Sequence, residues 1–207
     1  MAPEPRIYVY KMTTDNGGAP CVSNGLLSLA ICKPEIRRMA KVGSIILGFG
    51  GSEYNERLLY IAEVTEKPPL GDYYRARCYA KRPDCIYVLN PDGSARRKPS
   101  ARYHTKTDER RRDVGLKGEK AHVLLSSEFR YFGENGTNDY KQHYSAIKSV
   151  VESLKRGHRV NHLKTLRLQL LQLKEAMWQK FSKKKMGQPS VKDLGGICNR
   201  SSASTRC

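Results

Sequence analysis

Five short runs of apolar and β-branched residues in the first 125 positions predict strands. They lie at residues 6–10, 44–49, 57–65, 85–89 and 121–125. Their lengths are those of strands, and glycine or proline interrupts the chain between several of them. A short helix is predicted from Pro34 to Ala40, because proline lacks the N–H that the first turn of a helix leaves unpaired.

Two C-terminal segments have the three- and four-residue apolar spacing of helices. The first spans 139–156 and is followed by Gly157, a favourable C-terminal cap. The second begins after Asn161, and its apolar stripe consists of Leu163, Leu166, Leu170, Leu173 and Met177. A stripe of this kind is typical of a helix that packs against a sheet or a partner chain.

Residues 90–118 contain few apolar side chains and two arginine-rich runs, which predicts a long basic loop. We therefore expect an α+β fold, with a small, strongly curved mixed sheet or open barrel, short helices and a basic helical extension. The expected parts are a domain over 1–135, the extension over 136–186 and a disordered tail over 187–207.

Net charge is the outlying quantity of the composition. The chain carries 38 Lys and Arg against 20 Asp and Glu, a formal net charge of +18. The excess lies in two blocks: residues 75–112 hold 12 basic against 4 acidic side chains, and residues 151–207 hold 13 against 3. A neutral body with two basic blocks is typical of a phosphate-binding footprint, so we expect a nucleic acid as the partner.

Six cysteines show no CxxC pair and no signal peptide precedes them, which predicts reduced thiols in a cytoplasmic protein. Cys78 and Cys85 with His104 could ligate zinc, but their spacing matches no standard site, and we expect no metal. No stretch is apolar and long enough to span a membrane. The run Gly48-Phe-Gly-Gly51 is neither a Walker loop nor a dinucleotide fingerprint, so no nucleotide cofactor is expected.

Six motifs between residues 6 and 133 are distinctive. They are Tyr8-Val-Tyr-Lys-Met-Thr-Thr-Asp-Asn-Gly-Gly-Ala-Pro-Cys21, Ile31-Cys-Lys-Pro34, Val42-Gly-Ser-Ile-Ile-Leu-Gly-Phe-Gly-Gly51, Tyr60-Ile-Ala-Glu-Val-Thr65, Arg82-Pro-Asp-Cys-Ile-Tyr87 and Leu124-Leu-Ser-Ser-Glu-Phe-Arg-Tyr-Phe-Gly133. In these the chain resembles the nucleotide-modification-associated domain 2 family. The order of elements around 43–65 is also similar, more weakly, to PUA-like and EVE domains. The first resemblance implies a prokaryotic or phage setting, with double-stranded DNA that carries modified bases as the partner. The second implies a pocket for an extruded base.

A protein that handles an altered base in DNA must take that base out of the stack. It needs cations for the backbone and a lined pocket for the base. The residues predicted to contact DNA are Arg75, Arg77, Arg82, Arg96, Arg97, Lys98, Arg110, Arg111, Arg112, Lys164 and Arg167. The residues predicted to line the base pocket are Phe49, Gly50, Tyr73, Tyr74, Ser126 and Phe129, although aromatic residues at strand ends are also common in cores.

Excision of the base would need a carboxylate to stabilise an oxocarbenium-like transition state. Asp15 is the first choice and Asn16 could hold the base or a water, but both could simply form the turn. Asp84 is the second carboxylate, with a salt bridge to Arg82 or a neighbouring arginine as the alternative. Lys11 could instead attack the sugar as a Schiff-base nucleophile. We therefore expect a DNA glycosylase for hypermodified bases in anti-phage defence, with a non-catalytic reader or an accessory modification factor as alternatives.

Overall fold

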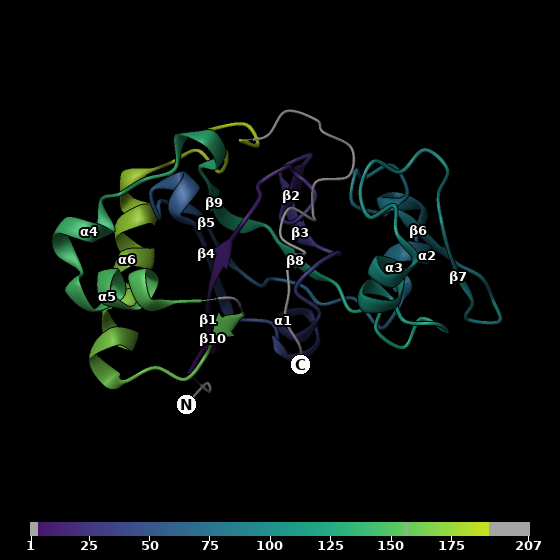
Figure 1. Cartoon of the computed structure of the whole chain (residues 1–207), viewed down its shortest axis with the longest axis horizontal. Coiled ribbons are helices and arrows are strands. Elements are labelled where there is room, and N and C mark those ends of the chain that lie inside the picture. Colours follow the sequence, from purple (N-terminus) through teal and green to yellow (C-terminus); the bar gives the residue numbers. More distant parts are fainter. Residues whose placement is uncertain (1–3, 156, 191–207) are drawn as a thin grey trace.

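The structure is a computed structural model of the 207-residue chain, and it describes residues 4–155 and 157–190. Its main sheet has five strands in the order β10-β1-β4-β5-β9 (Figure 1). These are β1 (Ile7–Met12), β4 (Ile45–Gly50), β5 (Leu58–Glu63), β9 (Glu128–Tyr131) and β10 (His158–Arg159). β1 and β4 run parallel and the other neighbours antiparallel, so the sheet is mixed, as predicted.

Two smaller sheets complete the fold. One joins β2 (Cys21–Ser23), β3 (Leu26–Leu29) and β8 (Leu124–Ser126), and the other joins β6 (Tyr87–Leu89) and β7 (Ala95–Arg97). A two-residue loop connects β2 to β3, and both its residues, Asn24 and Gly25, have positive φ, as a tight hairpin turn requires. Each sheet is open, which confirms the predicted α+β class with small unclosed sheets.

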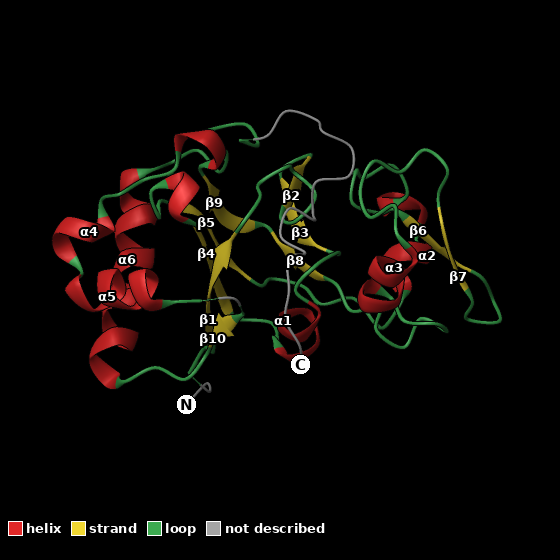
Figure 2. Ribbon diagram, viewed as in Figure 1, coloured by secondary structure: helices red, strands yellow, loops and turns green. Residues whose placement is uncertain are grey.

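Three C-terminal helices cover one face of the main sheet (Figure 2). They are α4 (Tyr140–His143), α5 (Ser145–Ser153) and α6 (Lys164–Lys180). The α6 stripe from Leu166 to Met177 packs with Ile7 and Val9 of β1 in a single core. The helical segment and the sheet thus share that core across the expected boundary at 135 and 136.

The opposite face of the main sheet carries a second core. Tyr8, Tyr10 and Met12 alternate with Ile7 and Val9 along β1 and point to this other side. There they pack with the β2-β3-β8 sheet and with the short helix α1 (Pro34–Met39). Because both faces of β1 are covered, all but one of its six side chains are buried.

A third core lies at the far end of the molecule from α6 (Figure 1). It includes residues of β6 and β7 and of α2 (Asp72–Arg75). The helix α3 (Thr107–Asp113) lies in the same part of the fold, so the expectation of an irregular loop over 90–118 is wrong for part of that segment. Short 3-10 turns occur at η1 (Ser52–Tyr54), η2 (Arg77–Tyr79) and η3 (Gly133–Asn135).

The segment after α6 runs beside β9 and η3. The Tyr131 N–H donates to the Lys184 carbonyl, and the Glu134 N–H donates to the Gln188 carbonyl at 2.9 Å. Of the tail predicted to be disordered, residues 187–190 therefore pack against the domain, and 191–207 lie outside the described residues. Within the described part of the chain, no helix has the length and apolarity needed to cross a membrane.

Candidate active site

A cavity of about 670 Å³ opens where the parallel strands β1 and β4 end. Its walls come from five segments of the chain, within 10–19, 32–34, 51–52, 104–113 and 154–157. The carboxyl ends of parallel strands are the usual place for ligand sites in open α/β sheets. Here the strand ends bring the Asp15 loop, the start of α1 and the end of α3 to one place.

Three side chains in the cavity wall form a continuous hydrogen-bonded line. The Cys32 thiol Sγ lies 3.2 Å from His104 Nε2, and His104 Nδ1 contacts the Asp113 carboxylate at Oδ2. His104 and Asp113 are buried, at 6% and 1% exposure, whereas Cys32 is half-buried. A thiol, an imidazole and a carboxylate in this order are the components of a cysteine-nucleophile triad.

Asp113 is held in place by further donors. The Cys32 backbone N–H donates to its Oδ1 at 2.8 Å, and the Tyr87 hydroxyl donates to its Oδ2 at 2.8 Å. The Arg37 guanidinium, fully buried, lies 3.4 Å from Oδ1 and supplies the countercharge. A carboxylate with this many fixed partners can hold the His104 ring in one orientation.

The backbone around the thiol has an unusual conformation. Cys32 and Lys33 have φ of +58° and +44°, and His104 has φ of +51°. Non-glycine residues seldom adopt this left-handed region, and the cost is about 1–3 kcal/mol for each. Arg37 stabilises the turn, because its Nε donates to the Cys32 carbonyl at 2.6 Å. Strained residues of this kind cluster at functional sites.

Among the charged side chains of the wall, cations outnumber carboxylates. Lys11, Lys33, Arg112 and Lys155 line the cavity, against the carboxylates of Glu109 and Asp113. Lys33 Nζ lies 4.4 Å from the centre of the Tyr10 ring, which forms part of the same wall. Arg112 and Lys155 are exposed at the rim. The cavity therefore suits an anionic ligand.

The predicted catalytic residues separate into two pairs. Lys11 and Asn16 line the cavity. Asp15 is fully buried behind the wall, and both its carboxylate oxygens accept from the Tyr131 hydroxyl at 2.9 Å. Asp84 is also fully buried, where it accepts from the Ser28 and Tyr73 hydroxyls. Its distance of 3.7 Å to Arg82 Nε corresponds to the salt bridge weighed as its alternative role.

The residues predicted to line a base pocket do not come together. Phe49, Tyr73 and Phe129 are fully buried and belong to three different cores. The other three also lie away from the cavity wall: Tyr74 packs in the third core, the Ser126 hydroxyl donates to the Glu128 carbonyl, and Gly50 packs against Tyr54. Both faces of the main sheet are covered by other layers, so aromatic side chains on its strands become core instead of surface.

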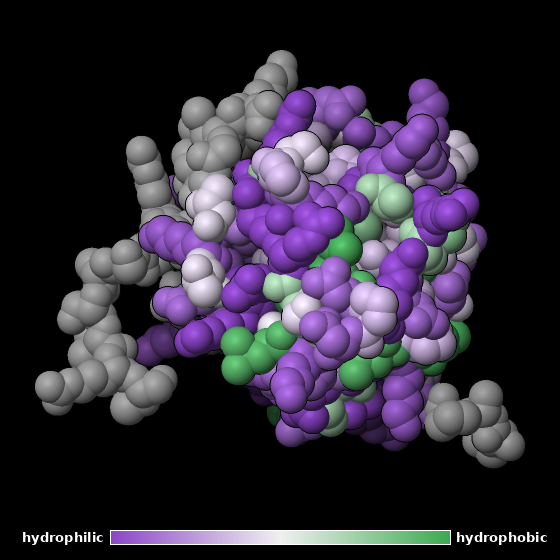
Figure 3. All heavy atoms as spheres, turned by 90° about the vertical axis from the view of Figure 1, so that its right-hand side faces the viewer, coloured by the Kyte–Doolittle hydropathy of each residue, from purple (hydrophilic) through white to green (hydrophobic). Residues whose placement is uncertain are grey.

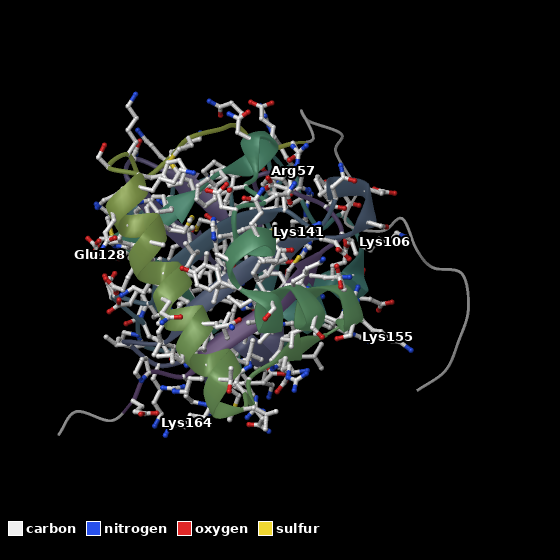
Figure 4. All side chains as sticks on the ribbon, turned by 90° about the vertical axis from the view of Figure 1, so that its left-hand side faces the viewer. Arg57, Lys106, Glu128, Lys141, Lys155 and Lys164 are labelled. Atoms are coloured by element: carbon white, nitrogen blue, oxygen red, sulfur yellow. The ribbon has the colours of Figure 1, made fainter. Side chains whose placement is uncertain are left out.

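The residues predicted to bind DNA differ in exposure. Those exposed are Arg75, Arg77, Arg96, Arg111, Arg112 and Lys164, and those half-buried are Arg97, Lys98, Arg110 and Arg167. Arg82 is buried and donates to the carbonyls of Ser23, Cys21 and Leu26, so it is part of the core. Figure 3 shows mostly hydrophilic side chains over the end formed by β6, β7, α2 and α3. Lys164, at the start of α6, lies at a different edge of the molecule from Lys155 of the cavity rim (Figure 4).

The zinc ligands considered from the sequence are not gathered. His104 contacts Cys32 and Asp113, Cys78 is exposed, and Cys85 is buried beside Lys98. Over residues 4–155 and 157–190, no group of three or more His, Cys, Asp or Glu side chains is arranged to hold a metal ion.

The chain belongs to the nucleotide modification associated domain 2 family, whose model matches residues 4–194. This confirms the resemblance based on the six motifs, and the match continues past residue 133 through all three C-terminal helices. The protein thus has a role associated with nucleotide modification. No curated protein and no solved structure matches the chain.

Asp15→Asn should stabilise the protein near neutral pH. Burial raises the pKa of Asp15, and hydrogen bonds from Tyr131 and Ser190 offset only part of that effect. A raised folded-state pKa means that the protonated group stabilises the fold at low pH and that this stability is lost as pH rises through the folded pKa. The Tm difference between variant and wild type should therefore grow from pH 4 to pH 8. A difference that shrinks with pH would show that ionised Asp15 stabilises the fold.

Proposed function

We propose that the protein binds DNA that carries modified bases and takes the modified nucleotide into the cavity beside Cys32. The observation that carries this is a roomy cavity, with more cations than carboxylates on its wall, in a member of a nucleotide-modification family. Pockets for small molecules commonly have volumes of about 300–1,000 Å³. At about 670 Å³ this cavity has room for a nucleotide with a bulky modification.

The charges suit an extruded nucleotide. Lys33 and Arg112 lie on the wall, and Lys155 lies at the rim, where a backbone phosphate would pass. Of the three consecutive arginines of α3, Arg112 is the one that lines the cavity. Phosphate contacts position a nucleic acid without specifying its sequence. Selectivity for the modified base would come from the polar groups inside the cavity.

We propose further that the protein excises the bound base, and the position of Lys11 favours this. Lys11 lines the cavity and forms an ion pair with Glu56 at 3.1 Å, with Asn16 close by on the same wall. With one proton passed to Glu56, its amine could attack the sugar C1′ and displace the base, which takes up a proton as it leaves. The C1′–O4′ bond then breaks, O4′ takes the remaining amine proton, and a Schiff base is left on the enzyme. Asp15, which has no surface on the cavity wall, would then have a structural role and no part in catalysis. A reader without chemistry would bind the same nucleotide and release nothing.

Competition between two duplexes of identical sequence, one with cytosine and one with glucosylated 5-hydroxymethylcytosine, tests the binding. An unmodified base would leave polar groups unpaired at about 1–3 kcal/mol each, so we expect roughly 5- to 150-fold tighter binding of the modified duplex. Lys33→Gln and Arg112→Gln should each reduce the slope of log affinity against log salt by about 0.9 if each contacts one phosphate. Arg6→Gln is the matched charge control, because Arg6 is exposed, lies at the opposite end of β1 from the cavity and is not among the predicted DNA contacts.

Equal binding of both duplexes would overturn the proposed base recognition, and a salt slope near zero would overturn DNA binding. The same mixtures, analysed for released base and for a borohydride-trapped adduct, decide whether excision occurs. We expect the adduct with wild type and none with Lys11→Ala. Tight binding without released base or adduct would identify a reader.

A further inference from the structure

The hydrogen-bonded side chains of Cys32, His104 and Asp113 have the geometry of a catalytic triad, which ligand binding alone would not require. A nucleophile and its base must lie within hydrogen-bond reach, and a third group must orient the base. The Sγ–Nε2 distance is 3.2 Å, and His104 Nδ1 contacts the Asp113 carboxylate. With Nδ1–H donated to that carboxylate, Nε2 is left to accept the thiol proton.

The surroundings indicate more than a packed thiol. Cys32 lies on the wall of the cavity and not within a core, and His104 and Asp113 border the same space. The Cys32 N–H and the His104 ring are fixed to opposite oxygens of one carboxylate. The thiol, the imidazole and the carboxylate therefore keep one relative position. This rigidity is what a nucleophile with an adjacent base requires.

We propose that Cys32 is the nucleophile of an acyl-transfer reaction, with His104 as general acid and base and Asp113 as the positioning residue. The substrate class is a nucleotide that carries an amide- or ester-linked acyl group on its base. The acyl carbon supplies the electrophile that a thiolate attacks. The cations Lys33, Arg112 and Lys155 on the same wall would hold the phosphate.

The steps balance without an oxidant or a reductant. His104 Nε2 takes the proton of the Cys32 thiol as Sγ bonds to the acyl carbon. The bond from that carbon to the amine or alcohol of the base then breaks, and the leaving group takes the proton from Nε2. In the second half water bonds to the acyl carbon, the C–S bond breaks, and one water proton passes through Nε2 to Sγ. The products are the deacylated nucleotide and a carboxylic acid.

The negative charge on the acyl oxygen needs hydrogen-bond donors. The Cys32 backbone N–H is already donated to Asp113, so it does not supply one. Asn16 lines the cavity, and its Oδ1 accepts from the Gly18 N–H at 3.0 Å. Its Nδ2 amide can donate, and Thr13 and Thr14, whose hydroxyls can also donate, line the same cavity. In this proposal the oxyanion is stabilised by donors from this loop.

The test treats the full chain with p-nitrophenyl acetate and locates the acetyl group by peptide mass spectrometry. We expect a burst of one equivalent of p-nitrophenol and an acetyl adduct on Cys32. Cys78, an exposed thiol, serves as the internal control for unassisted reaction. His104→Asn should slow acetylation of Cys32 by about 10²- to 10⁴-fold, the usual contribution of a general base, without changing that of Cys78. Asparagine is chosen because it tolerates positive φ.

Equal acetylation of Cys32 and Cys78 would overturn the proposal that Cys32 is an activated nucleophile. A folded His104→Asn variant with unchanged acetylation of Cys32 would overturn it as well. Cys32→Ser, a near-isosteric change, abolishes the adduct and keeps the proposal testable if the histidine variant fails to fold. Incubation with N4-acetyl-2′-deoxycytidine 5′-monophosphate then tests the substrate class, with wild type expected to release acetate. If Cys32 is acetylated by p-nitrophenyl acetate but this nucleotide is not deacetylated, the proposed substrate class is wrong and the proposed nucleophile stands. These assays contain no DNA, so their failure is distinct from failure of the DNA-binding proposal.

Discussion

Arg37→Met should destabilise the fold by about 3–5 kcal/mol, the usual cost of removing one partner of a buried ion pair. Arg37 is fully buried, and its guanidinium donates to three backbone carbonyls, those of Cys32, His122 and Asp113. Methionine would leave these carbonyls and the Asp113 carboxylate short of donors in a dry site. For a chain of this length the Tm should fall by roughly 6–20 °C.

Arg38→Met is the matched control for this experiment. Arg38 follows Arg37 on α1, is exposed, and forms a surface ion pair with Glu35 at 2.6 Å, so its loss should leave the Tm close to that of wild type. Differential scanning fluorimetry of both variants makes the comparison. Equal, small decreases in Tm for the two variants would show that Arg37 does not stabilise the Cys32 turn. Arg37→Lys should recover little, because an ammonium cannot reach several carbonyls at once as the planar guanidinium does.

Much of the fold could be predicted from apolar patterning. The five predicted strands correspond to β1, β4, β5, β6 and β8, each within a few residues, and Pro34 does open α1. The hairpin of β2 and β3 was missed, although its Asn24-Gly25 turn is a strong hairpin signal. The predicted helix over 139–156 is divided at Tyr144, whose ψ of 78° ends α4 and precedes α5.

The triad could not be predicted by the same reasoning. Helix α3 reads Thr-Asp-Glu-Arg-Arg-Arg-Asp from Thr107 to Asp113, with no apolar residue, and its buried positions are Glu109 and Asp113. Hydrophobic periodicity cannot predict a helix whose buried side chains are carboxylates. Cys32 and His104 lie 72 positions apart, and only the fold brings them together. The motif Ile31-Cys-Lys-Pro34 was the one available signal, since it places a cysteine two residues before a helix start.

The choice of Asp15 as the catalytic carboxylate shows that local sequence does not reveal the partners of a side chain. A carboxylate in a glycine-flanked loop after a strand is a reasonable choice from sequence, and Asp15 does lie beside the cavity wall. However, the Tyr131 hydroxyl and Ser190 occupy its oxygens. Tyr131 is 116 positions away and Ser190 is 175 positions away, so local sequence holds no information about them.

Gly48→Ala should destabilise the protein by about 1–3 kcal/mol, as overpacking of a filled core does. Gly48 of β4 lies between Tyr10 of β1 and Tyr60 of β5, whose hydroxyl oxygens are 2.8 Å apart. A Cβ at position 48 would come within 2.3 Å of the Tyr60 ring and 2.7 Å of Met12 Sδ. Because Tyr60 is buried and tied to Tyr10, its ring cannot move alone.

Since Tyr10 also lines the cavity, the displacement should reach the proposed nucleotide site and weaken binding of the modified duplex even where the variant remains folded. Gly51→Ala is the control on the same strand end. A Cβ there meets nothing closer than the Met12 carbonyl oxygen at 3.7 Å, and its φ of −71° suits any residue. We expect its Tm within roughly 2 °C of wild type, because a substitution without a clash usually changes stability by no more than about 0.5 kcal/mol. Urea unfolding gives the free energies for both variants, and a Gly48→Ala protein as stable as Gly51→Ala would show that the two tyrosines do not pack on β4 as described.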